Sequence, residues 1–264
     1  MRTRLASLLS LLLLACGSSP EAEAPASGGA QALRVSVDHI YPHDREAFTQ
    51  GLLWHEGWLY EGTGIEGASE LRRVEPESGR VEQSQALPAD VFGEGLALVG
   101  ERLVQLTWQS ERAFVYDRAS FALAREHRYQ GEGWGLCFDG QRLVMSDGSH
   151  VLQFRDPESF ELIGEVAVRD RGTIVGRLNE LECVNGEVYA NVWLTQQIVR
   201  IDPASGDVTA WIDAEGLLGL DGVGDTSGVD VLNGIAYVPE RERFLITGKY
   251  WPNLFEVRFV QDGE

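Results

Sequence analysis

The chain has 264 residues, of which 44% are hydrophobic and 9% aromatic, enough for one large all-β domain or two small domains. Its formal net charge of −19 argues against a nucleic-acid-binding protein, because such proteins need a basic face for phosphate groups. An acidic surface favours solubility and would also suit cationic substrates. The composition therefore indicates a packed globular protein with a solvated acidic surface.

The N-terminus has the pattern of an export signal. The basic stretch Met1–Arg4 precedes an apolar run, Leu5–Leu14, that is too short to span a bilayer. Cys16 directly follows Leu-Leu-Ala and precedes Gly-Ser-Ser, a sequence similar to a bacterial lipobox. We predict a lipoprotein signal peptide over residues 1–15 and lipidation of Cys16, which would hold the protein on a membrane without a spanning helix. An ordinary secretory signal that contains a cysteine is the alternative.

The segment after Cys16 is built almost entirely from Ser, Gly, Pro, Ala and Glu. Such a composition cannot bury enough apolar area to offset the entropy lost on ordering. We predict a flexible tether over residues 16–33 and one folded domain over residues 34–264. The residue after Cys16 is glycine and not an aspartate that would favour retention. We therefore expect an exported bacterial lipoprotein on the periplasmic side of the envelope, at the outer membrane, and a monomer.

A repeat dominates the rest of the sequence. Similar phrases recur at intervals of about 40 to 50 residues, a spacing typical of propeller blades. Each phrase has an apolar pair, a polar turn and a second strand-like run, which together predict a β-hairpin. The phrases align on Gly51, Gly95, Gly135, Leu181 and Gly234.

A second turn signature lies between the hairpins. It has an acidic residue, usually followed by proline, then serine and glycine or phenylalanine, and it occurs at residues 75–79, 117–121, 156–160 and 202–206. Each unit thus holds about four strands, as a propeller blade does. We predict an all-β protein folded as a five-bladed β-propeller, with the last blade completed by an N-terminal strand over residues 34–41. A β-sandwich of two sheets is the alternative.

The position before each aligned residue is the candidate site. Inner strands of a propeller converge on a channel, where small residues allow close approach; we expect them near residues 52–55, 96–99, 136–139, 181–184 and 235–238. The preceding residues would project near one end of the channel and differ between repeats, as site residues do. They are Gln50, Glu94, Trp134, Glu180 and Asn233.

The chemistry of these positions points to acid–base catalysis. Glu94 stands between two glycines, where burial would raise its pKa. A carboxylate that caps backbone N–H groups is the alternative. Lys249 ends a hairpin strand and could serve the site or simply pair with a carboxylate. Four tryptophans at strand ends could wall a pocket or pack in the core: Trp108, Trp134, Trp193 and Trp251.

Other kinds of site find no support in the sequence. The five histidines lack metal-ligand spacing, and Cys137 and Cys183 lack a CxxC partner. No nucleophile elbow, phosphate loop or dinucleotide fingerprint occurs. We predict no metal and no cofactor. In an exported protein the two cysteines could form a disulfide or remain buried thiols, and the sequence leaves both open.

Ten motifs occur in order between about residues 34 and 260: FTQGL (48–52), YEGTG (60–64), FGEGL (92–96), LTW (106–108), EGWGL (132–136), SDGS (146–149), LNELE (178–182), NVW (191–193), DVLNGIAY (230–237) and TGKYWP (247–252). Together they resemble the plant and bacterial type of glutaminyl-peptide cyclotransferase. The resemblance implies a five-bladed β-propeller that converts N-terminal glutamine of peptides or proteins to pyroglutamate and releases ammonia. This type is unrelated in fold to the zinc-dependent animal enzymes.

The resemblance also implies residue roles. Glu94 matches the family's catalytic acid, Asn179 its amide and Lys249 its lysine. The glycines beside Glu94 would then keep neighbouring side chains from crowding the substrate's amine. The residues implied or expected to bind substrate are Phe48, Gln50, Trp108, Trp134, Glu180 and Trp193. Plant members often carry serine where this chain has Gly62, a difference that we do not expect to affect the chemistry. Some plant members are associated with a structural calcium ion, but no loop here has the ligand spacing to assign one.

Two other functions stay open at this point. A calcium-dependent lactonase-like hydrolase would hold a metal with Glu94, Asn179, Glu180 and Asp225. Lys249 argues against this hydrolase, because a cation beside a metal cage makes little sense. A non-enzymatic, lipid-anchored scaffold would have no need for a carboxylate and a lysine at the channel mouth.

Overall fold

The computed structural model describes residues 29–261. Over this range the chain forms β-strands and one short 3-10 helix, Leu217–Gly219, which confirms the all-β prediction. The predicted signal peptide and Cys16 lie outside the described residues. Within residues 29–261, no helix has the length and hydrophobicity needed to cross a membrane.

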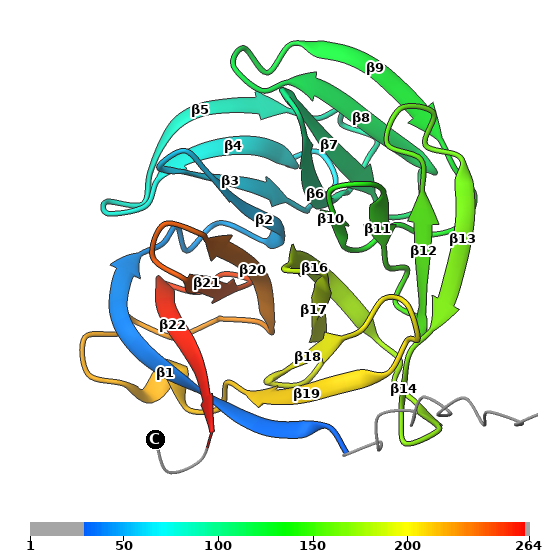
Figure 1. Ribbon diagram of the computed structural model, residues 1–264. Helices are drawn as coiled ribbons and strands as arrows, with labels where there is room; N and C mark the ends of the chain where they lie inside the picture. Colours follow the sequence, from blue (N-terminus) through cyan, green and yellow to red (C-terminus); the bar gives the residue numbers. More distant parts are fainter. Residues whose placement is uncertain (1–28, 262–264) are drawn as a thin grey trace, which may run out of the picture.

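Three four-stranded antiparallel sheets follow one another along the chain, each with its strands in sequence order (Figure 1). The first contains β2 (Thr49–His55), β3 (Trp58–Thr63), β4 (Glu70–Glu75) and β5 (Arg80–Ala86). The second contains β6 (Gly93–Val99), β7 (Arg102–Thr107), β8 (Arg112–Asp117) and β9 (Leu123–Arg128). The third contains β10 (Leu136–Phe138), β11 (Leu143–Met145), β12 (Val151–Arg155) and β13 (Leu162–Ala167). A small hairpin follows, β14 (Arg169–Asp170) and β15 (Thr173–Ile174).

The remaining strands form one eight-stranded sheet. One half contains β16 (Leu178–Val184), β17 (Glu187–Val192), β18 (Gln197–Ile201) and β19 (Val208–Asp213). The other half contains β1 (Gln31–Pro42), β22 (Asn253–Gln261), β21 (Arg243–Gly248) and β20 (Leu232–Val238). As predicted, β1 pairs with the last strand, β22, but it also pairs in parallel with β19 and thereby joins the two halves. The strand begins at Gln31, so ordered structure starts before the predicted boundary at residue 34.

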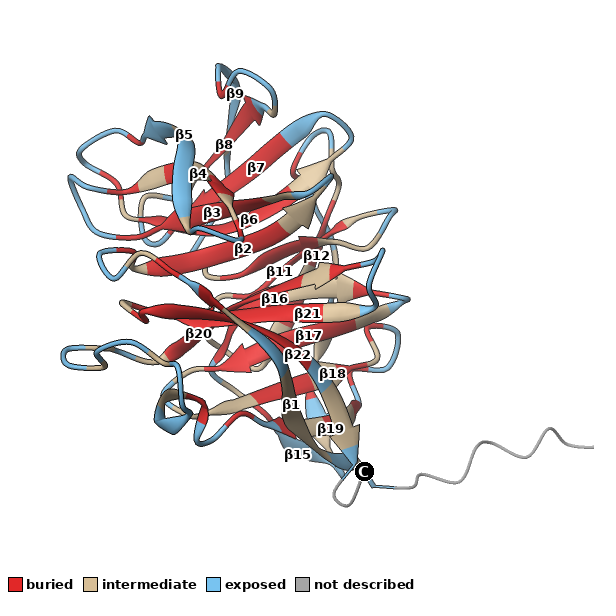
Figure 2. Cartoon of the chain, turned by 90° about the vertical axis from the view of Figure 1, so that its left-hand side faces the viewer, coloured by how far each residue is buried: buried red, intermediate tan, exposed pale blue. Residues whose placement is uncertain are grey.

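The sheets radiate from a common centre (Figure 1). The first strand of each unit lies innermost and contacts the next one around the centre: β2, β6, β10, β16 and β20. Apolar clusters fill the space between neighbouring sheets, whereas the outer strands β5 and β9 are largely exposed (Figure 2). This arrangement confirms the predicted inner strands, is consistent with a β-propeller and differs from the two facing sheets of a sandwich.

A β-bulge recurs near the start of four inner strands. The pairing register shifts within β2, β6, β16 and β20, at the points where polar side chains were predicted to project. A bulge inserts an extra residue and re-aims a side chain, and bulges are common beside active sites. In this fold the shifts lie at Gln50, Glu94, Asn179 and Asn233.

The bulges correct the sequence alignment by one residue in β16. The pairing places Asn179 at the position of Glu94, and Glu180 at the position of Gly95, where the alignment had set Leu181. The sequence repeat could not reveal this shift, because Glu180 replaces the glycine that marks the other copies. The consequence is that Asn179, not Glu180, projects like Glu94.

The glycines beside Glu94 are required by neighbouring backbone. A Cβ atom at Gly95 would lie 2.6 Å from the Trp134 carbonyl oxygen, and one at Gly93 would lie 2.7 Å from the Thr63 carbonyl oxygen. Such contacts are too short for any side chain, and Gly95 N–H already donates to the Trp134 oxygen at 2.7 Å. Strand convergence therefore accounts for these glycines, as the sequence predicted for Gly95.

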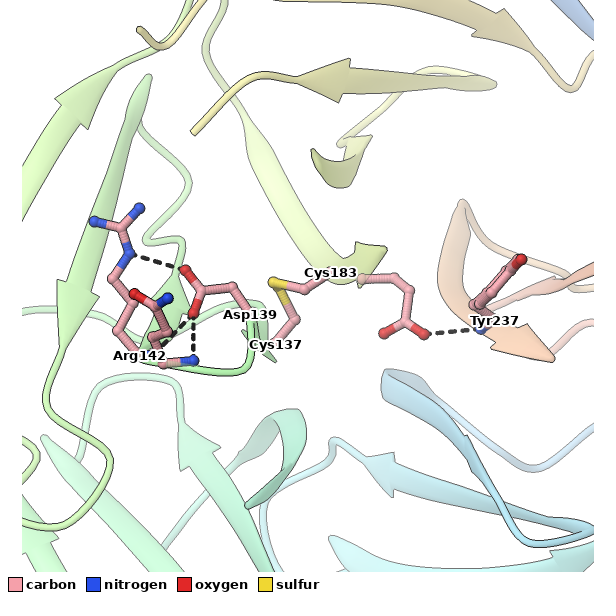
Figure 3. Close-up of a disulfide and its surroundings, with 7 residues drawn as sticks. Cys137, Asp139, Arg142, Cys183 and Tyr237 are labelled. Carbon is pink, nitrogen blue, oxygen red and sulfur yellow. Dashed lines mark hydrogen bonds and ion pairs between the residues drawn. A yellow bond between two sulfur atoms is a disulfide. The ribbon is translucent and has the colours of Figure 1, made fainter. Parts of the chain in front are cut away.

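Cys137 and Cys183 form a disulfide, which settles the alternative that the sequence left open (Figure 3). Their Cα atoms lie 5.5 Å apart, within the usual range for a bridge. The bond links β10 to β16, two neighbouring inner strands. It therefore fastens adjacent sheets near the centre of the fold.

Candidate active site

A cavity of about 250 Å³ opens at the end of the channel where the inner strands begin. Gln50, Glu94 and Asn179 reach it from the bulges of β2, β6 and β16. Lys249 and two of the tryptophans reach it because each directly follows the second strand of its hairpin. The lining residues are Phe48, Gln50, Phe92, Glu94, Trp108, Trp134, Asn179, Trp193 and Lys249. The fold thus brings together every predicted catalytic and substrate-binding residue except Glu180.

Glu94 is a buried carboxyl group, with only 4% of its surface exposed. Its Oε1 accepts a hydrogen bond from Gln50 Nε2 at 3.0 Å. Burial raises the pKa of Glu94 well above its usual value; the positive charge of Lys249 acts in the opposite direction, and the negative charge of Glu132 adds to the rise. A carboxyl group in this environment holds its proton to a higher pH than an exposed one and can exchange it with a bound molecule.

Lys249 is also buried, with 5% of its surface exposed. Its Nζ lies 4.6 Å from the centre of the Phe48 ring, in a cation–π arrangement. Burial lowers the pKa of Lys249, whereas the negative charges of Glu94 and Asp230 favour its charged form. Within the described part of the chain, Lys249 forms no ion pair at 4.0 Å or less, so its N–H groups remain available to a ligand.

Asn179 is held by its backbone and presents its side chain to the cavity. Its carbonyl oxygen accepts a hydrogen bond from Ser146 Oγ at 2.6 Å. Its Oδ1 atom is buried and has no hydrogen-bond partner among residues 29–261. A buried amide without an internal partner is costly unless water or a ligand completes it. Because the side chain lines the cavity, its NH₂ group can donate a hydrogen bond to a bound molecule, whereas the unpaired Oδ1 could only accept one.

Aromatic rings form the walls of the cavity. Phe92 stands edge to face with Phe48, at 5.9 Å between ring centres, and with Trp108, at 5.8 Å. Trp134 and Trp193 form a second such pair at 5.4 Å. These rigid walls surround the polar groups with apolar surface, which suits a small, partly apolar ligand.

Glu132 joins the two groups of rings. Its Oε2 accepts hydrogen bonds from the indole Nε1 of Trp108 at 2.8 Å and of Trp134 at 3.0 Å, and its Oε1 accepts from Gln109 Nε2 at 2.9 Å. Partial burial tends to raise the pKa of Glu132, but the hydrogen bonds from Gln109 and the indoles outweigh it, and the pKa is lowered. Glu132 therefore stays ionised and fixes both tryptophans.

Sequence reasoning missed Phe92 and Glu132. Both lie inside quoted motifs, Phe92 two residues before Glu94 and Glu132 two residues before Trp134. Their closeness in sequence to a predicted site residue could have identified them, but only one aligned position in each repeat was considered. Neither residue occupies that position.

Glu180, predicted to bind substrate, does not line the cavity. It is completely buried, and its two oxygens accept the backbone N–H groups of Leu52 at 3.2 Å and Ile235 at 2.8 Å. It therefore fastens the inner strands β2, β16 and β20 together. The structural alternative of a carboxylate that caps backbone N–H groups applies to Glu180 and not to Glu94.

The residues of the alternative calcium cage are also separated. Asp225 is exposed and pairs with Arg45 at 3.0 Å, away from the cavity. Among residues 29–261, no group of three or more His, Cys, Asp or Glu side chains is arranged to hold a metal ion. Trp251, predicted as a pocket wall or a core residue, is fully buried in the core.

Comparison with known proteins agrees with the geometry of the site. The sequence model of the family described as glutamine cyclotransferase matches residues 8–259. The glutaminyl-peptide cyclotransferase of Arabidopsis thaliana is 41% identical over 230 residues, which cover 86% of this chain and 72% of the plant protein. The crystal structure of Myxococcus xanthus glutaminyl cyclase matches with a TM-score of 0.81 and 43% identity, covering 88% of this chain and 98% of that one. The chain belongs to the glutamine cyclotransferase family.

Proposed function

We propose that this protein converts the N-terminal glutamine of peptides and proteins to pyroglutamate and releases ammonia. The observation that carries the proposal is the convergence of Glu94, Asn179 and Lys249 in one cavity with aromatic walls. The names of its relatives support the same reaction. The volume of the cavity suits a single side chain, so the glutamine would enter and the rest of the peptide would stay outside.

The reaction closes a ring within the substrate. The α-amine nitrogen forms a bond to the γ-carboxamide carbon, the carbon–nitrogen bond of the amide then breaks, and the nitrogen leaves as ammonia. Glu94 accepts a proton from the attacking amine and delivers a proton to the departing nitrogen. The raised pKa of Glu94 suits both steps, because the same group must gain and lose a proton near neutral pH.

The other lining residues stabilise the developing negative charge and orient the glutamine side chain. Lys249 and the side-chain amide of Asn179 donate hydrogen bonds to the oxygen that becomes negatively charged when the amine attacks. The aromatic walls hold the glutamine side chain folded back on its own amine. Orienting two groups for an intramolecular attack can lower the activation barrier by several kcal/mol. Every developing charge then has a partner in the protein, and the proposed reaction needs no metal.

Incubation with a glutaminyl peptide tests this function. We expect release of ammonia and formation of the pyroglutamyl peptide, with equal rates in the presence and absence of a chelator. Lys249→Ala and Asn179→Ala should each raise the barrier by about 2.7–4 kcal/mol if they serve the oxyanion. Absence of ammonia release would reject the function. Activity that returned only with added calcium would favour the lactonase-like alternative.

We also propose that the fold has five blades. The eight-stranded sheet would then count as two blades, β16–β19 and β20–β22 with β1, joined where β1 meets β19. The ring of inner strands supports this count. An experimental structure with another number of blades would contradict it.

Location at a membrane is a separate proposal, carried by the sequence around Cys16. The chain would be exported, lipidated at Cys16 and held on the periplasmic side of the outer membrane as a monomer. Cys16→Ser should move the protein from the detergent phase to the aqueous phase in a phase-partition experiment. Unchanged partitioning would contradict lipidation.

A further inference from the structure

A chain of hydrogen bonds runs from β20 to the carboxyl group of Glu94. Asn233 Nδ2 donates to Gln50 Oε1 at 3.1 Å, and Gln50 Nε2 donates to Glu94 Oε1 at 3.0 Å. Asn233 is completely buried and Gln50 is 4% exposed. Gln50 lines the cavity, whereas Asn233 lies behind it and does not. Asn233 can therefore act on the reaction only indirectly, and its hydrogen bond to Gln50 leads to Glu94.

The backbone carbonyl of Thr49 fixes which group donates in each of these hydrogen bonds. Asn233 Nδ2 also donates to the backbone carbonyl oxygen of Thr49 at 3.0 Å, and a carbonyl oxygen can only accept. Asn233 must therefore present its NH₂ group to both Thr49 and Gln50. The Gln50 carbonyl must then face Asn233, which turns the Gln50 NH₂ group toward Glu94. Glu94 Oε1 is left as an acceptor.

The other atom of the Asn233 amide supports this order. Asn233 Oδ1 is buried without a hydrogen-bond partner among the described residues. An orphaned acceptor costs free energy, so the orientation of the amide is set by its two donated bonds and not by its acceptor. Reversing Asn233 would bring its oxygen against the oxygens of Thr49 and Gln50.

We propose that Asn233 is a positioning residue that orients the Gln50 amide, so that Glu94 Oε1 accepts and the transferred proton is carried on Oε2. This inference rests on the proposed function. A donor to the carboxylate favours its ionised form and so opposes the effect of burial. Without Asn233, Gln50 could turn its carbonyl toward Glu94, which would then favour the protonated acid.

Apart from the carboxylate that an aspartate in place of Asn233 would add, the charged groups that face Glu94 are unchanged in the variants. Lys249 follows β21, Glu132 precedes β10, and Tyr129, whose pKa burial raises to about 12, stays neutral. A matched control is Asn191 on β17. Its Oδ1 accepts from Gly234 N–H at 2.9 Å and its Nδ2 lacks a partner within the described range. Aspartate at this position would introduce a buried carboxyl group and lose no hydrogen bond.

The test is the pH dependence of kcat/KM with one glutaminyl peptide, which keeps the titration of the substrate amine identical between variants. In Asn233→Asp, which cannot donate as an ionised group, the acid limb should move up by about one pH unit, the scale of one lost hydrogen bond to a carboxylate. Activity should recover at high pH. Asn233→Ser, which is neutral and keeps one donor, should shift the limb in the same direction by less. Asn191→Asp should leave the limb in place.

The outcomes separate the two proposals. An inactive wild-type protein rejects the proposed function itself. An active wild type with an unshifted limb in both Asn233 variants rejects the role of Asn233, as does an equal loss of activity at every pH. The same shift in Asn191→Asp would assign the effect to added charge and also reject it. If Asn233→Asp does not fold, as judged by circular dichroism, Asn233→Ser decides.

Discussion

At the residue scale, Glu132 does not line the pocket but holds two of the rings that do. Its single Oε2 atom accepts both indole N–H groups, from Trp108 and Trp134. Glu132→Ala should leave these rings without their shared acceptor and lower kcat/KM about 30-fold, mainly through KM, because two hydrogen bonds of about 1 kcal/mol each are lost. Tryptophan fluorescence of the free protein should change in parallel.

Glu132→Gln is the matched control, because the amide oxygen of glutamine can accept both indoles while the charge is removed. We expect the KM and the tryptophan fluorescence of Glu132→Gln to lie close to the wild-type values. If Glu132→Gln is as impaired as Glu132→Ala, the charge of Glu132 matters and not its role as an acceptor. Unchanged kinetics in Glu132→Ala would show that the rings need no such clamp.

Individual residues were predictable where the repeat placed them at comparable positions. Gln50, Glu94 and Trp134 were found in this way, since polar or aromatic side chains stood where a plain strand residue would serve. Glu180 was misplaced because one copy of the repeat lacks the marker glycine. Glu132 was missed because its role depends on the distance between two indoles, which the sequence does not contain.

At the scale of elements, the hairpins and turns followed from local chemistry. Gly, Asn, Asp and Pro at the turns specify the chain reversals without reference to the rest of the fold. The bulges did not follow, since an extra residue alters the pairing of a strand but not its composition. The parallel pairing of β1 with β19 also escaped prediction, because the repeat assigned the N-terminal strand to the last unit alone.

Gly95 links an element to its neighbour, and it yields a prediction on stability. In Gly95→Ala the added methyl group would lie 2.6 Å from backbone atoms of Trp134 and Leu136. Either β6 or β10 must shift, which should destabilise the protein by about 1–3 kcal/mol, the usual cost of overpacking. Because the shift also displaces Glu94, activity should fall as well. The midpoint of urea unfolding measures the first effect.

Gly219→Ala is the control for this substitution. A Cβ atom at Gly219 meets no other atom within 4 Å, and the backbone there needs no glycine. Its urea midpoint should lie close to that of the wild type. Equal midpoints for Gly95→Ala and Gly219→Ala would contradict the close approach of β6 and β10.

At the scale of the whole molecule, buried carboxyl groups at the centre make stability depend on pH. Burial raises the pKa of Glu182 from 4.5 to about 8, although its carboxylate accepts N–H groups of Tyr237 and Cys183. Because the pKa of Glu182 is higher in the folded than in the unfolded protein, the protonated carboxyl group favours the folded state. This contribution to stability is complete below about pH 4.5 and is lost as the pH rises through 8. Glu182 keeps some exposure, so the loss should be less than about 1.4 kcal/mol per pH unit.

Glu182→Gln isolates this contribution, because glutamine can accept the same N–H groups and does not ionise. The variant should match the wild type at pH 5 and unfold at a higher temperature than the wild type at pH 9. Thermal melts of both proteins across this range provide the measurement. A difference that is constant with pH would show that Glu182 does not carry the proton.

The central claim is that Glu94 moves the proton in a cyclisation that takes place in the cavity. The most direct measurement is kcat for ammonia release from a glutaminyl peptide, in the wild type and in Glu94→Gln. Glutamine keeps the size of the side chain but cannot exchange a proton, so kcat should fall about 10²-fold or more. Circular dichroism should show both proteins folded. A kcat for folded Glu94→Gln close to that of the wild type would contradict the account.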